Sequence, residues 1–360
     1  MGLADTVARR IRGVADAASG LRARWSTPRE PLQAVQPSTP AASAIAQRFA
    51  SLRNDGNAHF FDALAAHLAG SVDDPCLPMY FNFALSANAR GRRAAEMIDT
   101  IVPLAGKRAL DVGCAYGGFI VGLASLGADP AGFDIDASLL ALGEHNYRDV
   151  GLRFPTHVAD LTKGSDIAPF REAFDVITCN DVIEHVGDPR IAIRHIGTML
   201  RPGGLAYFEI PNRDEVSAVI SDGHYQLFGI TQLDAAQAAR YFEAHAPGTP
   251  YGVGHYLTLD EYRALFTEAG LVMEDRTDPA MVRTLESVEE LLTELERGLP
   301  DKLASVPEPV RKQVAASVRE YLVRARVTRS DGPAERTAYL SRYGASFWRV
   351  IGTKPILDAG

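Results

Sequence analysis

Short apolar runs alternate with helical patterns through the middle of the chain. Strands that alternate with helices of about 10–15 residues are typical of βαβ units, whose right-handed crossovers build a parallel sheet. The segment 137–149 is one such helical pattern between two apolar runs. The pattern therefore predicts an α/β fold. The apolar runs lie at 107–113, 129–136, 153–160, 174–180 and 205–212.

Other elements are predicted on both sides of this region. Helical spacing recurs at 42–70 and 84–101 before it, and at 283–327 after it, with a break at 306–309. A helix near 189–200 should end at the sequence LRPGG, which is typical of a stop before the next strand. Thr258, with Glu261 three residues on, predicts the start of a helix over 258–269. Two further strands are expected at 271–277 and 346–355.

The first 40 residues differ from the rest in composition. Apolar residues at helical spacing with arginines between them predict an amphipathic helix within 1–30, and a Pro-rich stretch at 26–40 is typical of a linker. A helix that docks on the protein is the favoured interpretation. Attachment to an acidic membrane surface is the alternative.

Composition limits the class of protein. The 360 residues carry 37 Lys and Arg against 45 Asp and Glu, a net charge of −8, which argues against a nucleic-acid partner bound by bulk charge. The three cysteines show no CxxC spacing and favour neither a disulfide framework nor a thiolate zinc site. No apolar run approaches the roughly 18 residues of a membrane span, and the N-terminus lacks the apolar region of a signal peptide. We therefore expect a cytoplasmic protein without a transmembrane segment.

A glycine-containing turn follows the first predicted strand. In the sequence DVGCAYGG, Asp111, Gly113, Ala115 and Gly117 stand where a strand passes into a helix, and residues without bulk there admit a ligand close to the backbone. The GxGxxG pattern of a pyrophosphate site is absent. The turn therefore favours a ligand without phosphate, with Asp111 near a cationic group.

Two acidic residues follow at the ends of later strands. Asp134 ends the second predicted strand and can accept hydrogen bonds from both hydroxyls of a ribose. Asp160 ends the third and is placed to accept from an adenine amino group. Each aspartate alone could equally cap a loop. Together with the glycine turn they predict a nucleoside site.

On these motifs the chain resembles the class I S-adenosylmethionine-dependent methyltransferases over about 107–212, 255–280 and 346–355. The resemblance implies a Rossmann-like three-layer sandwich with a seven-stranded, mostly parallel sheet whose last strand is antiparallel, and S-adenosylmethionine as cofactor. The motifs are ALDVGCAYGG (109–118), GFDID (132–136), ADL (159–161), FDVITCNDVIEHVGDP (174–189), LRPGGLAYFEIPN (200–212) and FWRVIGTKP (347–355).

The resemblance also implies which residues hold the cofactor. Tyr80, in a segment similar to a lid of relatives, would reach the methionine carboxylate, with Arg90 or Arg92 as alternatives. Asn180 would lie beside the sulfonium. The remaining predicted contacts are Asp111, Gly113, Ala115, Gly117, Asp134, Ile135, Asp160 and Leu161.

Three polar residues after the fourth predicted strand are candidates for catalysis. Asp181, Glu184 and His185 would share one face of a helical turn. They could brace the loop, or His185 could act as general base. Small-RNA 2′-O-methyltransferases and ubiquinone-pathway O-methyltransferases look similar here, which leaves a third interpretation: a divalent-metal site of these three residues with His255. The metal is the least favoured of the three.

The segments outside the resemblance are predicted to bind the acceptor. We expect an N-terminal helical arm and lid at 1–94, then a methyltransferase domain at 95–355 with helical insertions at 212–257 and 281–344. The first insertion is predicted as a substrate cap, and the second as a helical hairpin that serves as a cap or a homodimer contact. Candidate substrate contacts in the first insertion are His224, Tyr225, His255 and Tyr256, each of which could instead be loop packing.

These observations predict methyl transfer from S-adenosylmethionine to an oxygen of a small molecule or glycan. The glycan follows from DGHYQLFG (222–229), which resembles methyltransferases of polysaccharide and natural-product pathways. A metal-assisted RNA 2′-O-methyltransferase is one alternative, and it would need a basic cleft. A non-catalytic S-adenosylmethionine-binding scaffold or regulator is another.

Overall fold

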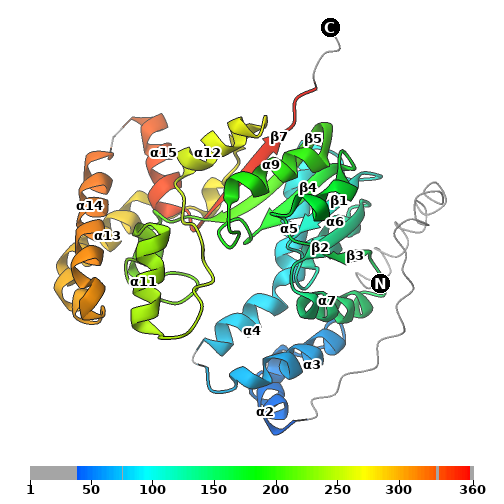
Figure 1. Cartoon of the computed structure of the whole chain (residues 1–360), viewed down its shortest axis with the longest axis horizontal. Helices are drawn as coiled ribbons and strands as arrows, with labels where there is room; N and C mark the ends of the chain where they lie inside the picture. Colours follow the sequence, from blue (N-terminus) through cyan, green and yellow to red (C-terminus); the bar gives the residue numbers. More distant parts are fainter. Residues whose placement is uncertain (1–38, 75, 330–331, 357–360) are drawn as a thin grey trace. The chain divides into compact units, whose positions relative to one another are not determined.

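A computed structural model describes residues 39–74, 76–329 and 332–356 (Figure 1). The predicted amphipathic helix in 1–30 and nearly all of the predicted linker lie outside the described residues. The chain divides into two compact units, one of residues 1–179 and 199–204, the other of 180–198 and 205–360. Among the described helices, none combines the length and the apolar character that a membrane crossing requires.

The strands form one seven-stranded sheet of order β3-β2-β1-β4-β5-β7-β6. β1 pairs in parallel with β2 and β4, and β2 pairs in parallel with β3, whereas β7 runs antiparallel to β5 and β6. The expected Rossmann-like sheet with an antiparallel last strand is confirmed. The strands are β1 Arg108–Val112, β2 Asp129–Asp134, β3 Thr156–Val158, β4 Phe174–Asn180, β5 Leu200–Pro211, β6 Val272–Asp275 and β7 Phe347–Thr353.

Helices of the first unit cover its strands and build an N-terminal layer. α6 and α7 pack on β1, β2 and β3, and α3 packs on α7. The buried carboxylate of Asp149 accepts the backbone N–H groups of His59 and Phe60 at 3.0 and 2.8 Å, so it ties the start of α3 to the end of α7. The helices are α2 Pro40–Arg48, α3 Ala58–His67, α4 Leu77–Leu85, α5 Ala87–Ile101, α6 Gly118–Ser125, α7 Ala137–Asp149 and α8 Gly164–Ile167, with 3₁₀ turns at Ala50–Leu52, Leu68–Ser71 and Ala168–Phe170.

The second unit has a hydrophobic core of its own, formed mainly by α10, α11, α13, α14 and α15. Residues 281–344, predicted as a helical hairpin, contain a third helix, α15, which the Pro at its first position favours. The first insertion contains α10 and α11. The helices are α9 Pro189–Met199, α10 Val216–Ile220, α11 Ala235–His245, α12 Leu259–Glu268, α13 Leu285–Ala304, α14 Glu308–Val327 and α15 Pro333–Gly344, with 3₁₀ turns at Ile230–Gln232 and Pro279–Met281.

One predicted strand boundary differs from the structure, and one predicted domain boundary falls within a helix. The sequence LRPGG was expected to separate a helix from the next strand, but β5 begins at Leu200, directly after α9. A positive φ at Gly203 accommodates the Pro-Gly sequence within the strand. The expected start of the methyltransferase domain at residue 95 falls inside α5, which runs unbroken from Ala87 to Ile101.

Glycines let α5 and α6 approach until their backbones touch. A Cβ added at Gly122 of α6 would lie 2.3 Å from the carbonyl carbon and oxygen of Gly91 of α5. A Cβ at Gly91 would lie 2.2 Å from the carbonyl oxygen of Gly118, the first residue of α6. This contact sets the position of the start of α6, and therefore of the glycine turn that leads into it.

We expect Gly122→Ala to destabilise the protein by about 1–3 kcal/mol, because an overpacked methyl group forces the helices apart. Gly298→Ala in α13 is the matched control, since a Cβ at that helical position meets nothing within 4 Å. It should stabilise the protein by about 0.5–1 kcal/mol through helix propensity. Chemical denaturation gives the free energy of unfolding of both variants. Equal changes in that free energy would contradict the backbone contact.

Candidate active site

The turn after β1 has a backbone suited to close approach of a ligand. Gly113, Ala115 and Gly117 have positive φ angles of 65°, 40° and 71°. For Ala115 this left-handed conformation costs about 1–2 kcal/mol. Ala115 thus has a glycine-like backbone between the two glycines of the turn.

Asp134, the last residue of β2, holds this turn. Its Oδ2 accepts the N–H of Ala115 and its Oδ1 accepts the N–H of Asp136, both at 2.9 Å. Burial raises the pKa of Asp134, although the backbone N–H donors oppose the shift. The adjacent Ile135 is 67% exposed, a high value for an apolar side chain. The predicted ribose acceptor and an exposed apolar surface therefore lie side by side in the chain.

Asp160, after β3, has the contacts of a loop cap. Its Oδ1 accepts the N–H and the hydroxyl of Thr162 at 2.9 and 2.7 Å, and the Nζ of Lys163 lies 3.4 Å from its Oδ2. Leu161 beside it is buried. The adenine contact of Asp160 and Leu161 stays a prediction.

In the predicted lid, the two candidate arginines differ. Arg92 pairs with Glu96 at 2.9 Å on the exposed side of α5. The guanidinium of Arg90 lies 3.7 Å from the ring centroid of Phe83 on α4. Tyr80, also on α4, is 38% exposed. Arg92 is thus engaged with Glu96, and the contact of Tyr80 or Arg90 with the methionine carboxylate stays a prediction.

Asp111 is buried at the end of β1. The hydroxyl of Thr178 donates to its Oδ1 at 2.7 Å. Burial raises the pKa of Asp111 to about 7, against the opposing effects of the Thr178 hydrogen bond and the positive charge of Arg90. A cationic group brought next to Asp111 would favour its ionised form, as expected for a residue beside a charged ligand.

The segment after β4 forms a single turn, but Asp181 lies outside it, unlike in the prediction. Asp181 has a φ of 52°, a left-handed backbone that interrupts a right-handed helical path. The N–H of His185 then donates to the carbonyl of Val182 at 2.9 Å, which closes a single turn, and α9 starts only at Pro189. Asn180 before it is buried, and among the described residues neither polar atom of its amide has a hydrogen-bond partner.

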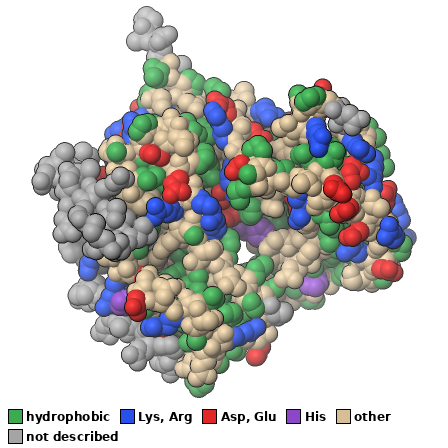
Figure 2. Space-filling view, turned by 180° about the vertical axis from the view of Figure 1, so that it is seen from behind, with side chains coloured by type: hydrophobic (Ala, Val, Ile, Leu, Met, Phe, Trp, Pro, Cys, Tyr) green, Lys and Arg blue, Asp and Glu red, His purple; other side chains and the backbone are tan. Residues whose placement is uncertain are grey.

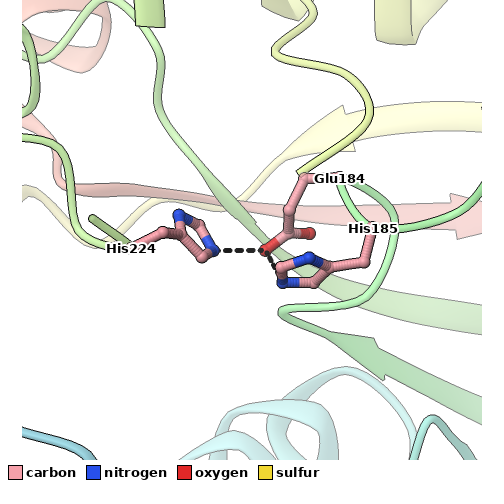
Figure 3. A group of neighbouring side chains, drawn as sticks. All are labelled: Glu184, His185 and His224. Carbon is pink, nitrogen blue, oxygen red and sulfur yellow. Dashed lines mark ion pairs between the residues drawn. The ribbon is translucent and has the colours of Figure 1, made fainter. Parts of the chain in front are cut away.

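Glu184, His185 and His224 converge in the second unit (Figure 3). The Nε2 atoms of His185 and His224 lie 3.7 and 3.8 Å from the same oxygen, Oε1 of Glu184. The Glu184 carboxyl group is buried, and neither oxygen accepts a hydrogen bond from any described residue. Burial, together with the charge of Asp181, raises the pKa of Glu184 well above its usual range.

In both His185 and His224 the hydrogen bond is made by Nδ1, which leaves Nε2 facing Glu184. Nδ1 of His185 lies 2.7 Å from the carbonyl oxygen of Gly252, which can only accept, so Nδ1 is the donor. In the neutral ring Nε2 therefore presents a lone pair toward Glu184. Burial, and secondarily the nearby His185, lowers the pKa of His224 to about 4, so that ring is neutral near pH 7.

The group that the structure brings together differs from the predicted metal set. His224, predicted as a substrate contact, takes the place of His255. The Nε2 of His255 lies 3.1 Å from the carbonyl of Gly187, outside the group. The backbone N–H groups of Gly254 and His255 instead donate to the carbonyl of Glu184 at 2.7 and 3.1 Å. Asp181 acts on Glu184 through its charge and is not in the group.

Tyr225 and Tyr256, the remaining predicted substrate residues, contact other groups of the same insertion. The hydroxyl of Tyr225 accepts the N–H of Gly252 at 2.9 Å, and its ring packs on Phe242. The hydroxyl of Tyr256 lies 2.8 Å from Nδ1 of His224 and donates to Asp222 at 3.3 Å. Asp222 was missed by sequence reasoning. The Asp-Gly pair at 222–223, typical of a capped turn, was its signal.

Comparison with known proteins identifies the family. A family model described as "Methyltransferase domain" matches residues 87–275. The chain belongs to this family. The predicted resemblance to class I S-adenosylmethionine-dependent methyltransferases is thereby confirmed.

The curated relatives of this methyltransferase include ubiquinone biosynthesis O-methyltransferases of several bacteria. The ubiquinone biosynthesis O-methyltransferase of Thiobacillus denitrificans is 28% identical over 50% of this chain and 71% of its own. That of Methylococcus capsulatus is 35% identical over 33% of this chain and 49% of its own. The chain thus spans between half and somewhat over two thirds of these relatives.

Among solved structures, a SAM-dependent methyltransferase from Archaeoglobus fulgidus is 13% identical. The alignment covers 78% of this chain and 100% of that one, with a TM-score of 0.45.

The raised pKa of Asp111 predicts a pH-dependent stability of the cofactor-free methyltransferase. Between pH 4 and pH 7 the folded state retains a proton that the unfolded state has lost, so stability falls as pH rises, by at most about 1.4 kcal/mol per pH unit. Asp111→Asn removes the titrating group and with it this fall in the free energy of unfolding. The variant should therefore gain stability relative to the wild type from pH 4.5 to pH 7. Urea unfolding across this range measures it.

The control is Asp129→Asn, at the exposed first position of β2. Its stability should follow the wild type at every pH. Identical pH profiles for Asp111→Asn and the wild type would contradict the assignment.

Proposed function

We propose that this methyltransferase transfers the methyl group of S-adenosylmethionine to a hydroxyl oxygen of a small molecule, and that Glu184, His185 and His224 activate the acceptor. The observation that carries the proposal is the buried carboxyl group of Glu184, which accepts no hydrogen bond from the described part of the chain and faces two imidazole nitrogens. A hydroxyl is a poor nucleophile until its proton is removed, so its methylation needs a basic centre. The names of the relatives agree with methylation of oxygen.

The three side chains fit a divalent cation. One carboxylate oxygen and two imidazole nitrogens suit Zn²⁺ or Mn²⁺. The second ring nitrogen of a ligating histidine is normally hydrogen-bonded, as Nδ1 of His185 is to Gly252. A bound cation would lower the pKa of a coordinated hydroxyl. It would also offset the burial of the Glu184 carboxylate, which no described side chain does.

The chain's own residues would supply the rest of the acceptor chemistry. Glu184 provides the negative charge that attracts the cation, and the two histidines fix its position. The sulfonium is already electrophilic, so alignment of the acceptor oxygen with the methyl group is the main further requirement. A glycan acceptor and a homodimer stay predictions from the sequence.

Surface charge favours a small acceptor over RNA. On the face drawn in Figure 2, basic and acidic side chains are interspersed rather than gathered by sign. With a net charge of −8, this arrangement offers little attraction to a phosphate backbone.

The ribose role proposed for Asp134 predicts a loss of cofactor affinity. Asp134→Ala should weaken binding of S-adenosylhomocysteine about 10- to 100-fold, since a hydrogen bond to a charged group contributes about 1.5–3 kcal/mol. Titration calorimetry measures the affinity. Asp129→Ala, at the other end of β2, should bind as the wild type does, and unchanged affinity of Asp134→Ala would refute the role.

The proposed metal group predicts different effects for two histidines. After metal loading and dialysis, His224→Gln should lose most bound Zn²⁺ or Mn²⁺, because it removes one of three ligands. His255→Gln should retain the metal. Elemental analysis gives the metal content, and removal of the metal from the wild type with a chelator should lower methylation of a panel of phenols and alcohols. Metal retained by His224→Gln and lost by His255→Gln would contradict the grouping.

A further inference from the structure

A chain of polar groups within the first insertion leads to His224. The hydroxyl of Tyr256 lies between two of them, 3.3 Å from Oδ2 of Asp222 and 2.8 Å from Nδ1 of His224. Asp222 is 1% exposed, and its side chain is anchored in the turn that carries His224. These contacts therefore connect the buried carboxyl group of Asp222 to Nδ1 of His224, whose Nε2 faces Glu184.

The direction of these hydrogen bonds follows from Asp222. Its carboxyl oxygens accept the backbone N–H groups of His224 at 2.9 Å, Tyr225 at 3.1 Å and Leu227 at 2.7 Å. N–H donors on both oxygens favour the ionised form of this carboxyl group, which then accepts from Tyr256 at 3.3 Å. The hydroxyl of Tyr256 therefore donates its one proton to Asp222. Its oxygen is left to accept from Nδ1 of His224.

This direction determines the tautomer of His224. When Nδ1 carries the proton, Nε2 of the neutral ring has a lone pair, and that atom lies 3.8 Å from Oε1 of Glu184. His185 is also protonated on Nδ1, because that atom donates to the carbonyl of Gly252. Both imidazoles thus direct lone pairs to one carboxyl oxygen.

We propose that Tyr256 and Asp222 are positioning residues that hold His224 in the Nδ1-protonated tautomer, with the lone pair of Nε2 directed toward Glu184. The proposal rests on the proposed function for its consequence, because metal binding or acceptor activation at Nε2 needs this lone pair. The tautomer itself is independent of any ligand. If the hydroxyl of Tyr256 is removed, Nδ1 loses its hydrogen-bond acceptor, because Oδ2 of Asp222 lies 3.8 Å away, beyond hydrogen-bond distance.

The test is the tautomer of His224 in the metal-free, full-length protein. Nitrogen-15 NMR of histidine-labelled protein distinguishes the two neutral tautomers, and the spectrum of His224→Gln identifies the His224 signals among the nine histidines. In the wild type we expect Nδ1 protonated and Nε2 unprotonated. In Tyr256→Phe the Nε2-protonated tautomer should become the major form. Asp222→Asn should shift the balance in the same direction.

Tyr251→Phe is the matched control. Its hydroxyl is buried in the same insertion and has no hydrogen-bond partner among the described residues, so its removal should leave the tautomer of His224 unchanged. A wild-type ring protonated on Nε2 would overturn the proposal. So would a Tyr256→Phe ring still protonated on Nδ1.

Zn²⁺ titration separates this proposal from the proposed function. If both hold, Tyr256→Phe should weaken Zn²⁺ binding about 10- to 100-fold relative to the wild type and to Tyr251→Phe, as loss of a partner behind a ligand commonly does. If the wild type shows the expected tautomer and binds no Zn²⁺ or Mn²⁺, the metal part of the proposed function fails and the positioning role stands. If the wild-type His224 is protonated on Nε2 and the protein binds Zn²⁺ tightly, the positioning role fails and the metal part of the proposed function stands.

Discussion

The burial of the Glu184 carboxyl group is the constraint on which the proposed acceptor site depends. An ionised carboxylate without hydrogen bonds costs several kcal/mol in a protein interior, so either a proton or a cation must compensate it. Two imidazole nitrogens face the same oxygen. Because those nitrogens offer lone pairs rather than protons, a cation meets the needs of all three groups at once.

A second constraint acts on the turn that is proposed to hold the cofactor. The backbone contact between α5 and α6 brings the start of α6 to a set position, and the carboxylate of Asp134 secures the preceding turn by accepting the N–H of Ala115. These contacts keep the backbone open where bulky side chains would block a ligand. In the proposed cofactor site, a turn already formed by these contacts reduces the entropy that binding must offset.

Much of the fold could be predicted because it follows from local rules. The helix over 137–149 has the predicted ends, and Thr258 and Glu261 form the predicted capping box. The carboxyl ends of β1 and β2 carry the predicted acidic residues. Prediction was wrong where a single backbone angle decided the outcome. The positive φ of Asp181 places that residue outside the helical turn that spacing alone suggested, and the strand at Leu200 continues through Pro and Gly.

The sequence by itself determined the α/β class, the family and the candidate cofactor residues, because strands, helix caps and glycine turns are encoded within a few neighbouring positions. Only the tertiary structure decided which histidine joins Glu184. His224 and His255 are both distant from Glu184 in the chain, and each stands in a polar, aromatic segment. Folding of the insertion directs the ring of one toward Glu184 and that of the other toward the carbonyl of Gly187. Such a choice depends on how a loop packs, which residue spacing does not record.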